Sequence, residues 1–216
     1  DFLAAGEREV LYGGSAGGGK SYAMLADPLR YMGHPSFSGL LLRHTTEELR
    51  ELIYKSKEIY PQIWKGIKWS ERKMQWEAPS GARLWMSYLD REDDVLRYQG
   101  LAFSWIGFDE LTQWATPYAW NYMRSRLRSV ASDLPVYMRA TTNPGGPGHQ
   151  WVKKMFIDPA PYGRQFDATD IESGNILSYP KGHTKSGQPL FKRRFIPARL
   201  SDNPYLAETG DYETML

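Results

Sequence analysis

A glycine-rich loop closed by a lysine and a serine constrains the fold of this chain more than any other stretch. Residues 10–21 read Val-Leu-Tyr-Gly-Gly-Ser-Ala-Gly-Gly-Gly-Lys-Ser, a short apolar run that breaks into five glycines before Lys20. They match the pattern G-x-x-x-x-G-K-[ST], in which consecutive backbone N–H groups curl around a phosphate. A Cβ at most of these positions would block that path. The stretch therefore predicts a strand, a phosphate-binding loop and a helix.

The residues of this loop predict a nucleotide site. Lys20 is expected to reach the β- and γ-phosphates, and Ser21, which opens the helix, to bind Mg²⁺. The phosphates of ATP would be cradled by Gly14, Ser15, Ala16, Gly17, Gly18, Gly19, Lys20 and Ser21. The alternative is a flexible loop that fits by chance, which would happen in about one chain in a hundred. A strand before the loop and a helix after it favour nucleotide binding.

Bulk properties narrow the class of protein further. With 216 residues, 41% of them hydrophobic, the chain can bury a full core and is most simply one domain with a small appended segment. It contains neither an apolar run of membrane-spanning length nor a basic-then-apolar leader, so we expect no membrane association. The absence of cysteine excludes disulfides and thiolate chemistry. The chain opens at Asp1, and we expect it to be an excerpt of a longer polypeptide.

After the loop, apolar runs alternate with helical patterns. Residues 39–46 read Gly-Leu-Leu-Leu-Arg-His-Thr-Thr, which is typical of a buried parallel strand. Thr46 is expected to cap a helix that ends near Tyr60, where Pro61 stops it. Arg43, at the end of the strand, would contact a ligand or form a surface ion pair. The alternation predicts an α/β fold with a mostly parallel central sheet flanked by helices.

Between Trp69 and Tyr88 the pattern changes to short alternating segments around a Pro-Ser-Gly turn at 79–81. We expect a β-hairpin inserted in the main sheet or lying on its edge. Its tryptophans are expected to pack in the core rather than to stack on bases. The charged stretch 90–100 is expected to be an exposed helix or loop.

Two acidic residues follow an almost wholly apolar run. Residues 101–108 read Leu-Ala-Phe-Ser-Trp-Ile-Gly-Phe and end on Asp109 and Glu110. Buried strands of α/β sheets present ligand-contacting residues at their carboxyl ends. Downstream of a phosphate loop, Asp109 is expected to hold Mg²⁺ and Glu110 to polarise a water for attack on the γ-phosphate. Taken alone, the pair also fits acids that cap the next helix.

A helix with three arginines is predicted over residues 117–130. Arg124 and Arg128 would share one helical face by their i, i+4 spacing, and Arg126 would point elsewhere.

The strand predicted after that helix has a polar end. It begins near Pro135 and ends in Thr141, Thr142 and Asn143, before a rigid Pro/Gly turn. These side chains would sense the γ-phosphate and pass its presence to the loop beyond. The alternative is that they cap the following helix.

The pattern loosens after residue 157. Residues 158–187 predict irregular structure with one short strand at 175–179, followed by a basic edge strand at 192–197 and a final turn and short helix from Asp202. The basic residues that fit either DNA contact or a solvated surface are Lys153, Lys154, Lys192, Arg193 and Arg194. No two of the four histidines have ligand spacing, so we expect no histidine metal site.

Together these motifs resemble the ATPase domain of the large terminase subunit of tailed bacteriophages. The resemblance spans nearly the whole chain, through Gly13 to Ser21, Phe108-Asp109-Glu110-Leu111-Thr112, the Arg-x-Arg of Arg126 and Arg128, Ala140-Thr-Thr-Asn-Pro-Gly-Gly, Phe195-Ile-Pro-Ala and Asp202-Asn203-Pro204. It implies a P-loop NTPase of the additional-strand, conserved-glutamate type. Such a domain hydrolyses ATP to pump double-stranded DNA through a portal into a preformed capsid.

The resemblance also implies roles for single residues. Gly14 to Ser21 would be the Walker A loop, Asp109 and Glu110 the Walker B pair, and Thr141 to Asn143 the coupling motif, so that Thr142 and Asn143 join the nucleotide site. The motors of this family work as rings in which an arginine of one subunit completes its neighbour's site. Arg97 is the first choice for that finger, with Arg128 and Arg126 behind it.

The implied partners are double-stranded DNA, further copies of the chain, the portal protein and the small terminase subunit. The implied place of action is the host cell cytoplasm during virion assembly, and the protein would be no part of the mature virion. An upstream adenine-contacting segment and the nuclease domain of the family are missing, so we expect no nuclease activity. Residues 1–157 would form the P-loop ATPase core and residues 158–216 a C-terminal extension.

Two other functions compete with this interpretation. A helicase- or repair-type ATPase would share the chemistry, but no helicase signature follows Asn143. A nucleotide-switched assembly module would need only binding, and Glu110 argues against it because a switch has little use for a second acid poised for water.

Overall fold

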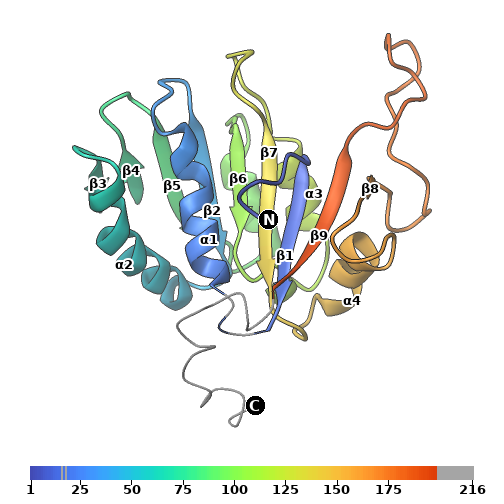
Figure 1. The fold of residues 1–216 in the computed structure, drawn as a ribbon, viewed down its shortest axis with the longest axis horizontal. Coiled ribbons are helices and arrows are strands. Elements are labelled where there is room, and N and C mark those ends of the chain that lie inside the picture. The colour runs from blue at the N-terminus through green and yellow to red at the C-terminus, as the bar shows by residue number, and fades with distance from the viewer. Residues whose placement is uncertain (16, 18, 199–216) are drawn as a thin grey trace.

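A computed structural model describes residues 1–15, 17 and 19–198. Within these residues the chain builds one nine-stranded sheet with helices on both faces (Figure 1). Its strand order is β3-β4-β5-β2-β6-β7-β1-β9-β8. The strands are β1 (Glu9–Gly14), β2 (Ser38–Arg43), β3 (Lys68–Ser70), β4 (Gln75–Glu77), β5 (Arg83–Tyr88), β6 (Trp105–Phe108), β7 (Tyr137–Thr142), β8 (Gln165–Asp167) and β9 (Lys192–Ala198).

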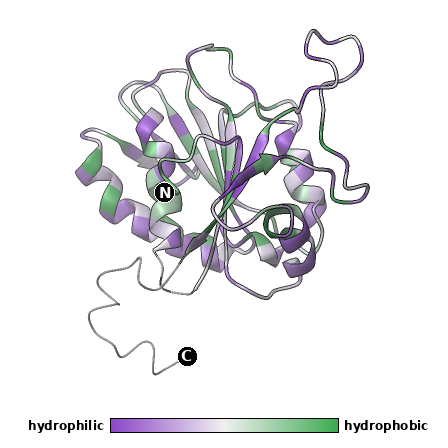
Figure 2. Cartoon of the chain, turned by 45° about the vertical axis from the view of Figure 1, so that its right-hand side comes forward, coloured by the Kyte–Doolittle hydropathy of each residue, from purple (hydrophilic) through white to green (hydrophobic). Residues whose placement is uncertain are grey.

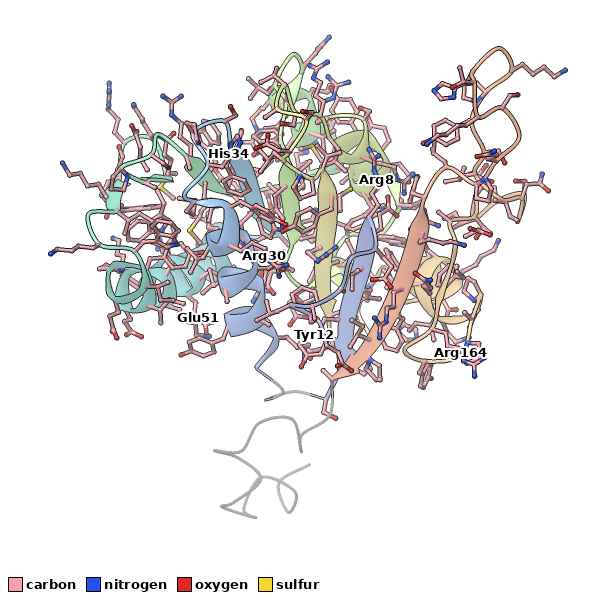
Figure 3. All side chains as sticks on the ribbon, turned by 45° about the horizontal axis from the view of Figure 1, so that its top comes forward. Arg8, Tyr12, Arg30, His34, Glu51 and Arg164 are labelled. Carbon is pink, nitrogen blue, oxygen red and sulfur yellow. The ribbon has the colours of Figure 1, made fainter. Side chains whose placement is uncertain are left out.

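The six strands from β5 to β9 across the middle of the sheet are all parallel, so their carboxyl ends meet at one edge. Strand β7 lies between β1, which leads into the glycine-rich loop, and β6, which leads into the two acids. The expected α/β class with a mostly parallel sheet is confirmed. Strand β7 is the additional strand that the resemblance implied, because it lies between the strand before the glycine-rich loop and the strand before the two acids. In Figure 3, Arg8 just before β1 and Tyr12 near its end mark the amino and carboxyl edges of the sheet.

Helices cover the two faces of the sheet because each strand sends apolar side chains both ways. In Figure 1, α1 (Lys20–Ala26) and α2 (Thr46–Ile63) lie in front of the sheet, and α3 (Tyr118–Arg124) lies behind it. The short α4 (His149–Val152) continues into a π-helical turn (Lys153–Ile157) on the same side as α3. Within the helices, the residues that face the sheet are hydrophobic, and most of those that face outward are hydrophilic (Figure 2). Three short 3-10 helices span Asp27–Tyr31, Glu92–Tyr98 and Leu111–Gln113.

The expected hairpin is present and belongs to the main sheet. Strands β4 and β5 pair antiparallel on either side of the turn at 79–81, and β5 also pairs in parallel with β2. The hairpin therefore widens the sheet, and β3 forms its outer edge. Trp76 is buried against Tyr60 and Trp69, so the expectation that these tryptophans pack is confirmed for this residue. The charged stretch after β5 forms the exposed 3-10 helix Glu92–Tyr98, as expected.

Both predicted ends of the helix after β2 were misplaced. The N-cap is Thr45 rather than Thr46, because Thr45 and Glu48 hydrogen-bond reciprocally in a capping box. The helix also runs through Pro61 to Ile63. Tyr60 and Trp64 donate hydrogen bonds to the carbonyls of Leu25 and Leu29, which holds the last turn in place despite the proline.

The arginine helix is shorter than predicted. Helix α3 ends at Arg124, so Arg124 and Arg128 do not share a helical face. The chain leaves the helix because Leu127 pairs in parallel with Phe103, with hydrogen bonds from the Phe103 N–H to the Arg126 carbonyl and from the Arg128 N–H to the Phe103 carbonyl.

The basic strand predicted at the edge of the sheet lies inside it. Strand β9 runs between β1 and β8, and Arg193 is fully buried. Its Nε lies 2.7 Å from a carboxylate oxygen of Glu9, which also pairs with Arg124 of α3. Arg193 is therefore a core ion-pair residue and cannot contact DNA, contrary to the prediction.

Replacing Glu9 with glutamine is expected to lower the free energy of unfolding by about 3–5 kcal/mol, because Arg193 would keep a buried charge without its counterion. Burial by itself raises the pKa of Glu9, but the charges of Arg124 and Arg193 outweigh it and hold the pKa below its ordinary value. The stabilisation that the charged Glu9 provides is therefore complete above its pKa in the unfolded chain, about 4.5. It is lost as the pH falls through the lower pKa of Glu9 in the folded protein. Urea unfolding at neutral and acidic pH tests this.

The exposed pair between Glu51 and Lys55 supplies the control for that experiment. Glu51→Gln should cost less than about 1 kcal/mol. An equal cost for both variants would show that the buried cluster contributes no more than a surface pair.

Residues 158–198 give two strands to the same sheet, so the expected domain boundary at residue 157 runs between strands of one sheet. The short strand expected at 175–179 appears as part of a protruding hairpin with two isolated bridges, Thr169 to Ile176 and Ser178 to Pro189. The final turn and helix expected from Asp202 lie outside the described residues.

Candidate nucleotide-binding site

The glycine-rich loop leaves the carboxyl end of β1 and enters α1 at Lys20. Gly14 has φ of +140°, and a Cβ there would lie 2.3 Å from the carbonyl oxygen of Ala198 in β9. Gly17 and Gly19 also have positive φ, and Gly19 forms the N-cap of α1. Ala16 and Gly18 lie outside the described residues. Gly14, Gly17 and Gly19 thus occupy backbone conformations that other residues rarely adopt.

The side chain of Lys20 folds back onto the loop. Its side chain is buried, and its Nζ donates a hydrogen bond of 2.6 Å to the carbonyl oxygen of Ser15. Burial lowers the pKa of Lys20, while the nearby charges of Glu110 and Asp109 act against that shift. Ser21 is the second residue of α1, half-buried at the helix start. An ammonium and a helix N-terminus thus face the same loop, which is a binding arrangement for anions.

Asp109 lies directly after β6 and is fully buried. Its Oδ1 accepts a hydrogen bond from the hydroxyl of Thr141, and its Oδ2 lies 3.3 Å from the Nε of Arg43. Burial raises the pKa of Asp109, and Arg43 opposes that shift. No described residue donates a hydrogen bond to Oδ2, which has Arg43 as its ion-pair partner.

The residues present fit a magnesium ion. Mg²⁺ takes oxygen ligands and is held in such sites by one or two protein groups together with substrate phosphates. The carboxylate oxygen Oδ2 of Asp109 and the hydroxyl of Ser21 are the groups that would hold it. Among residues 1–15, 17 and 19–198, no three His, Asp or Glu side chains gather as a metal site made by protein alone would require.

Glu110 is tied to the end of the neighbouring strand. The backbone N–H and the side-chain amide of Asn143 donate hydrogen bonds of 3.1 and 2.7 Å to its two carboxylate oxygens. The Glu110 N–H donates to the hydroxyl of Thr141, which fixes the residue in a left-handed conformation at φ of +61°. Burial raises the pKa of Glu110, and the charge of Asp109 raises it further. A raised pKa and a strained backbone are common at catalytic carboxylates.

Arg43 is a site residue whose role the sequence left open. It ends β2, it is nearly buried, and it lines a polar cavity of about 250 Å³ together with Glu48, Glu110 and Asn143. Of the two alternatives, the surface ion pair is wrong, because the ion pair with Asp109 is buried, and contact with a ligand stays a prediction. Only the order of strands could have shown this, since β2 lies directly beside β6.

Thr142 faces a second, mainly apolar cavity of about 300 Å³ on the α4 side of the sheet. Its hydroxyl donates to that of Thr112 at 3.0 Å. Gly13 and Gly14 line this cavity too, so the loop and the end of β7 share one wall.

The structure separates the arginines proposed as fingers. Arg97 lies in the 3-10 helix after β5, and its guanidinium donates to the carbonyl of Tyr88, the last residue of that strand. It is therefore at the carboxyl edge with the loop and the acids, with 47% of its side chain exposed. Arg128 contacts the carbonyl of Leu101, ahead of β6, and so lies at the amino edge, as does Arg126, which follows α3 and packs over Tyr122.

Strand β1 leads into a glycine loop closed by Lys20, and β6 leads into two acids, with β7 between these two strands. This arrangement defines a P-loop nucleotide-binding domain of the additional-strand class. The sequence profile of the phage terminase large subunit matches residues 7–181. The chain therefore belongs to the phage terminase large subunit family, and the resemblance found in the sequence is confirmed. No curated protein sequence matches the chain.

Solved structures share the fold at low sequence identity. The large terminase of a thermophilic bacteriophage superposes with a TM-score of 0.62 at 17% identity, over 98% of this chain and 46% of that one. The same protein in complex with ADP superposes with a TM-score of 0.58 at 16% identity, over 97% and 45%. The large terminase ATPase domain of Thermus phage P74-26 gives 0.56 at 12%, over 98% and 84%. The chain thus spans less than half of the first of these terminases.

None of the helices in the described part of the chain has the length and apolar character needed to cross a bilayer.

Proposed function

We propose that this chain is the ATP-hydrolysing motor domain of a DNA-packaging terminase, which translocates double-stranded DNA into a procapsid. The observation that carries the proposal is Glu110, held beside Asp109 and Lys20 at the carboxyl edge of the sheet and tied to Asn143. Family membership and the ADP complex of the thermophilic phage's terminase support ATP as the nucleotide.

Binding would place the phosphates inside the loop between Gly14 and Ser21. Lys20 would exchange its hydrogen bond to Ser15 for the β- and γ-phosphate oxygens. When bound, Mg²⁺ supplies charge neutralisation and orientation of the phosphate oxygens. Asp109, kept in position by Thr141 and Arg43, is pre-oriented for that role.

Glu110 would accept the proton of the water that attacks the γ-phosphorus as the bond to ADP breaks. In the structure each oxygen of its carboxylate accepts one hydrogen bond from Asn143. Each oxygen keeps a second lone pair that can accept a hydrogen bond from the attacking water. A proton taken up by Glu110 would weaken its hydrogen bonds from Asn143, and this would link hydrolysis to the end of β7 and to the Pro/Gly turn that follows it.

The wider roles follow the family. We propose that the chain acts as a ring of identical subunits on the portal protein with the small terminase subunit, in the host cell cytoplasm. ATP hydrolysis across a protein concentration series, with and without double-stranded DNA at low salt, tests this. A specific activity that rises with concentration and with DNA is expected. Flat activity indifferent to DNA would favour a self-contained ATPase, and tight binding without turnover would favour a nucleotide-switched assembly module.

Arg97→Ala is expected to leave ATP binding of the isolated chain unchanged and to abolish complementation of a neighbour in mixed assemblies. The reason is that Arg97 lies half-exposed at the site's edge, so it can reach a neighbouring subunit. Titrating the variant into wild-type chain while measuring hydrolysis checks this, with Arg128→Ala, at the opposite edge, as the matched control. Weaker ATP binding by the Arg97 variant alone would place this residue in its own subunit's site.

A further inference from the structure

Residues 168–191 form a hairpin arm that projects from the amino edge of the sheet, on the side away from the glycine loop (Figure 1). Backbone hydrogen bonds hold its two sides together, from Leu177 to Ala168, from Leu190 to Leu177 and from Tyr179 to Gln188. Nearly every residue from 172 to 189 is exposed, and the arm is predominantly hydrophilic (Figure 2). Its backbone order and exposure make it a surface that can meet a partner without refolding.

The charges of the arm are separated along it. Its two acids, Asp170 and Glu172, come near its start, whereas residues 173–198 contain five lysines and arginines and no aspartate or glutamate. At the base of the arm these charges are neutralised, since Lys192 pairs with Asp167, Arg193 with Glu9 and Arg194 with Glu7. Lys181 and Lys185 at the tip have no acidic partner among the described residues. Within residues 173–198, the cations without an acidic partner are therefore the two lysines of the tip.

The tip also carries a fixed aromatic pair. The rings of Tyr179 and His183 stack with centroids 4.5 Å apart and planes 16° apart, and the Nζ of Lys185 lies 5.9 Å from the Tyr179 ring centroid. The backbone N–H of Lys185 donates a hydrogen bond to Nδ1 of His183. This hydrogen bond places the proton of a neutral imidazole on Nε2, where it can be donated outward. Two ammonium groups and this imidazole therefore offer donors of the kind that bind phosphate oxygens.

We propose that the tip of this arm, formed by Tyr179, Lys181, His183 and Lys185, is a contact site for the phosphate backbone of double-stranded DNA. The identity of the polyanion rests on the proposed function. An acidic protein surface fits less well, because the tip offers only one large aromatic side chain, Tyr179, and its ring is already stacked on His183. The stacked, hydrogen-bonded tip is ordered before binding, which lowers the entropic cost of contact.

The arm replaces most of the basic residues that the sequence suggested for DNA contact. Arg193 is buried, and Lys153 pairs with Asp158 at 2.7 Å. The sequence did not reveal the arm, because residues 158–187 are rich in glycine and proline and predict irregular structure. The structure shows that part of this segment pairs with itself and projects from the sheet.

The test compares the full 216-residue chain with its Lys181→Ala/Lys185→Ala variant in binding to a fluorescent DNA duplex, from about 50 to about 200 mM salt. Loss of two phosphate contacts should weaken binding about tenfold at low salt and reduce the slope of log affinity against log salt by about 1.8. Basal ATP hydrolysis without DNA should be unchanged, since the tip is at the opposite edge from the loop.

The matched control is Lys65→Ala/Lys68→Ala, which removes the same charge from exposed lysines near the β3 edge. The proposal is overturned if the arm variant binds DNA as the wild type does, or if the control loses as much affinity. It is also overturned if poly-glutamate of equal charge displaces the labelled duplex as effectively as unlabelled DNA does, because the tip would then suit an acidic protein. A charge-reversed Lys181→Glu/Lys185→Glu variant must weaken binding further.

These outcomes separate the arm from the motor. If DNA stimulates hydrolysis by the wild-type chain and the arm variant still binds DNA normally, only the proposed role of the arm is refuted. A wild-type chain that hydrolyses ATP but binds no DNA at low salt would refute both the arm and the proposed DNA motor.

Discussion

Replacing Glu110 with glutamine is expected to leave ATP binding close to that of the wild type and to slow hydrolysis by roughly 10²- to 10⁴-fold, the usual contribution of a general base. Glutamine has nearly the same shape and can still accept a hydrogen bond from the Asn143 amide, so the site should keep its geometry. It cannot take a proton from water at neutral pH. Binding and turnover should therefore separate.

Glu48→Gln is the matched control for this experiment. Glu48 lines the same polar cavity as Glu110 and carries the same charge, but its carboxylate caps α2 through Thr45. A glutamine there can still accept that hydrogen bond, so hydrolysis should stay within a few-fold of wild type. Single-turnover measurement of phosphate release together with nucleotide binding distinguishes the variants. Hydrolysis at the parent rate by Glu110→Gln would mean that another group activates the water.

Replacing Lys20 with alanine is expected to weaken ATP binding by roughly 100-fold, since charge-assisted hydrogen bonds to phosphate contribute about 1.5–3 kcal/mol each. Among the described residues, Lys20 is the only lysine whose ammonium group donates a hydrogen bond to the loop, at the carbonyl oxygen of Ser15. Removing it leaves Arg43 to offset the charges of Glu110 and Asp109 without the help of Lys20. The added phosphate charge would then meet a more acidic pocket.

Calorimetric titration with ATP measures the Lys20 effect, and Lys57→Ala serves as control because that lysine of α2 pairs with the exposed Glu71, between β3 and β4. The control should bind ATP as the wild type does. Loss of affinity for ATP with equal loss for adenosine would point to a misfolded loop. Unchanged ATP affinity in Lys20→Ala would show that the loop is not the phosphate site.

Much of the site was predictable because its parts are local in sequence. The loop from Gly14 to Ser21 needs its glycines wherever it occurs, since positive φ and close backbone approach exclude other residues. The run before Asp109 predicts a buried strand from its composition alone. The α/β class followed from the alternation of such runs with helical patterns.

Other features depended on segments far apart in the sequence. Arg43 lies beside Asp109 only because β2 pairs with β6, and no local pattern reports that neighbour. Arg193 looked like an exposed basic residue, yet β9 inserts beside β1 and buries it against Glu9. The end of α3 was misjudged because pairing between Leu127 and Phe103 overrides helical periodicity.

The sequence by itself determined the chemistry of this protein: a phosphate loop, two acids after a buried strand and a polar strand end, each specified by backbone or side-chain requirements within a few residues. The tertiary structure alone decided that Glu110 meets Asn143, that Asp109 meets Arg43, and that the segment with Lys181 and Lys185 projects as an arm. The physical reason is that strand order and hairpin formation set distances between residues that sequence spacing leaves free.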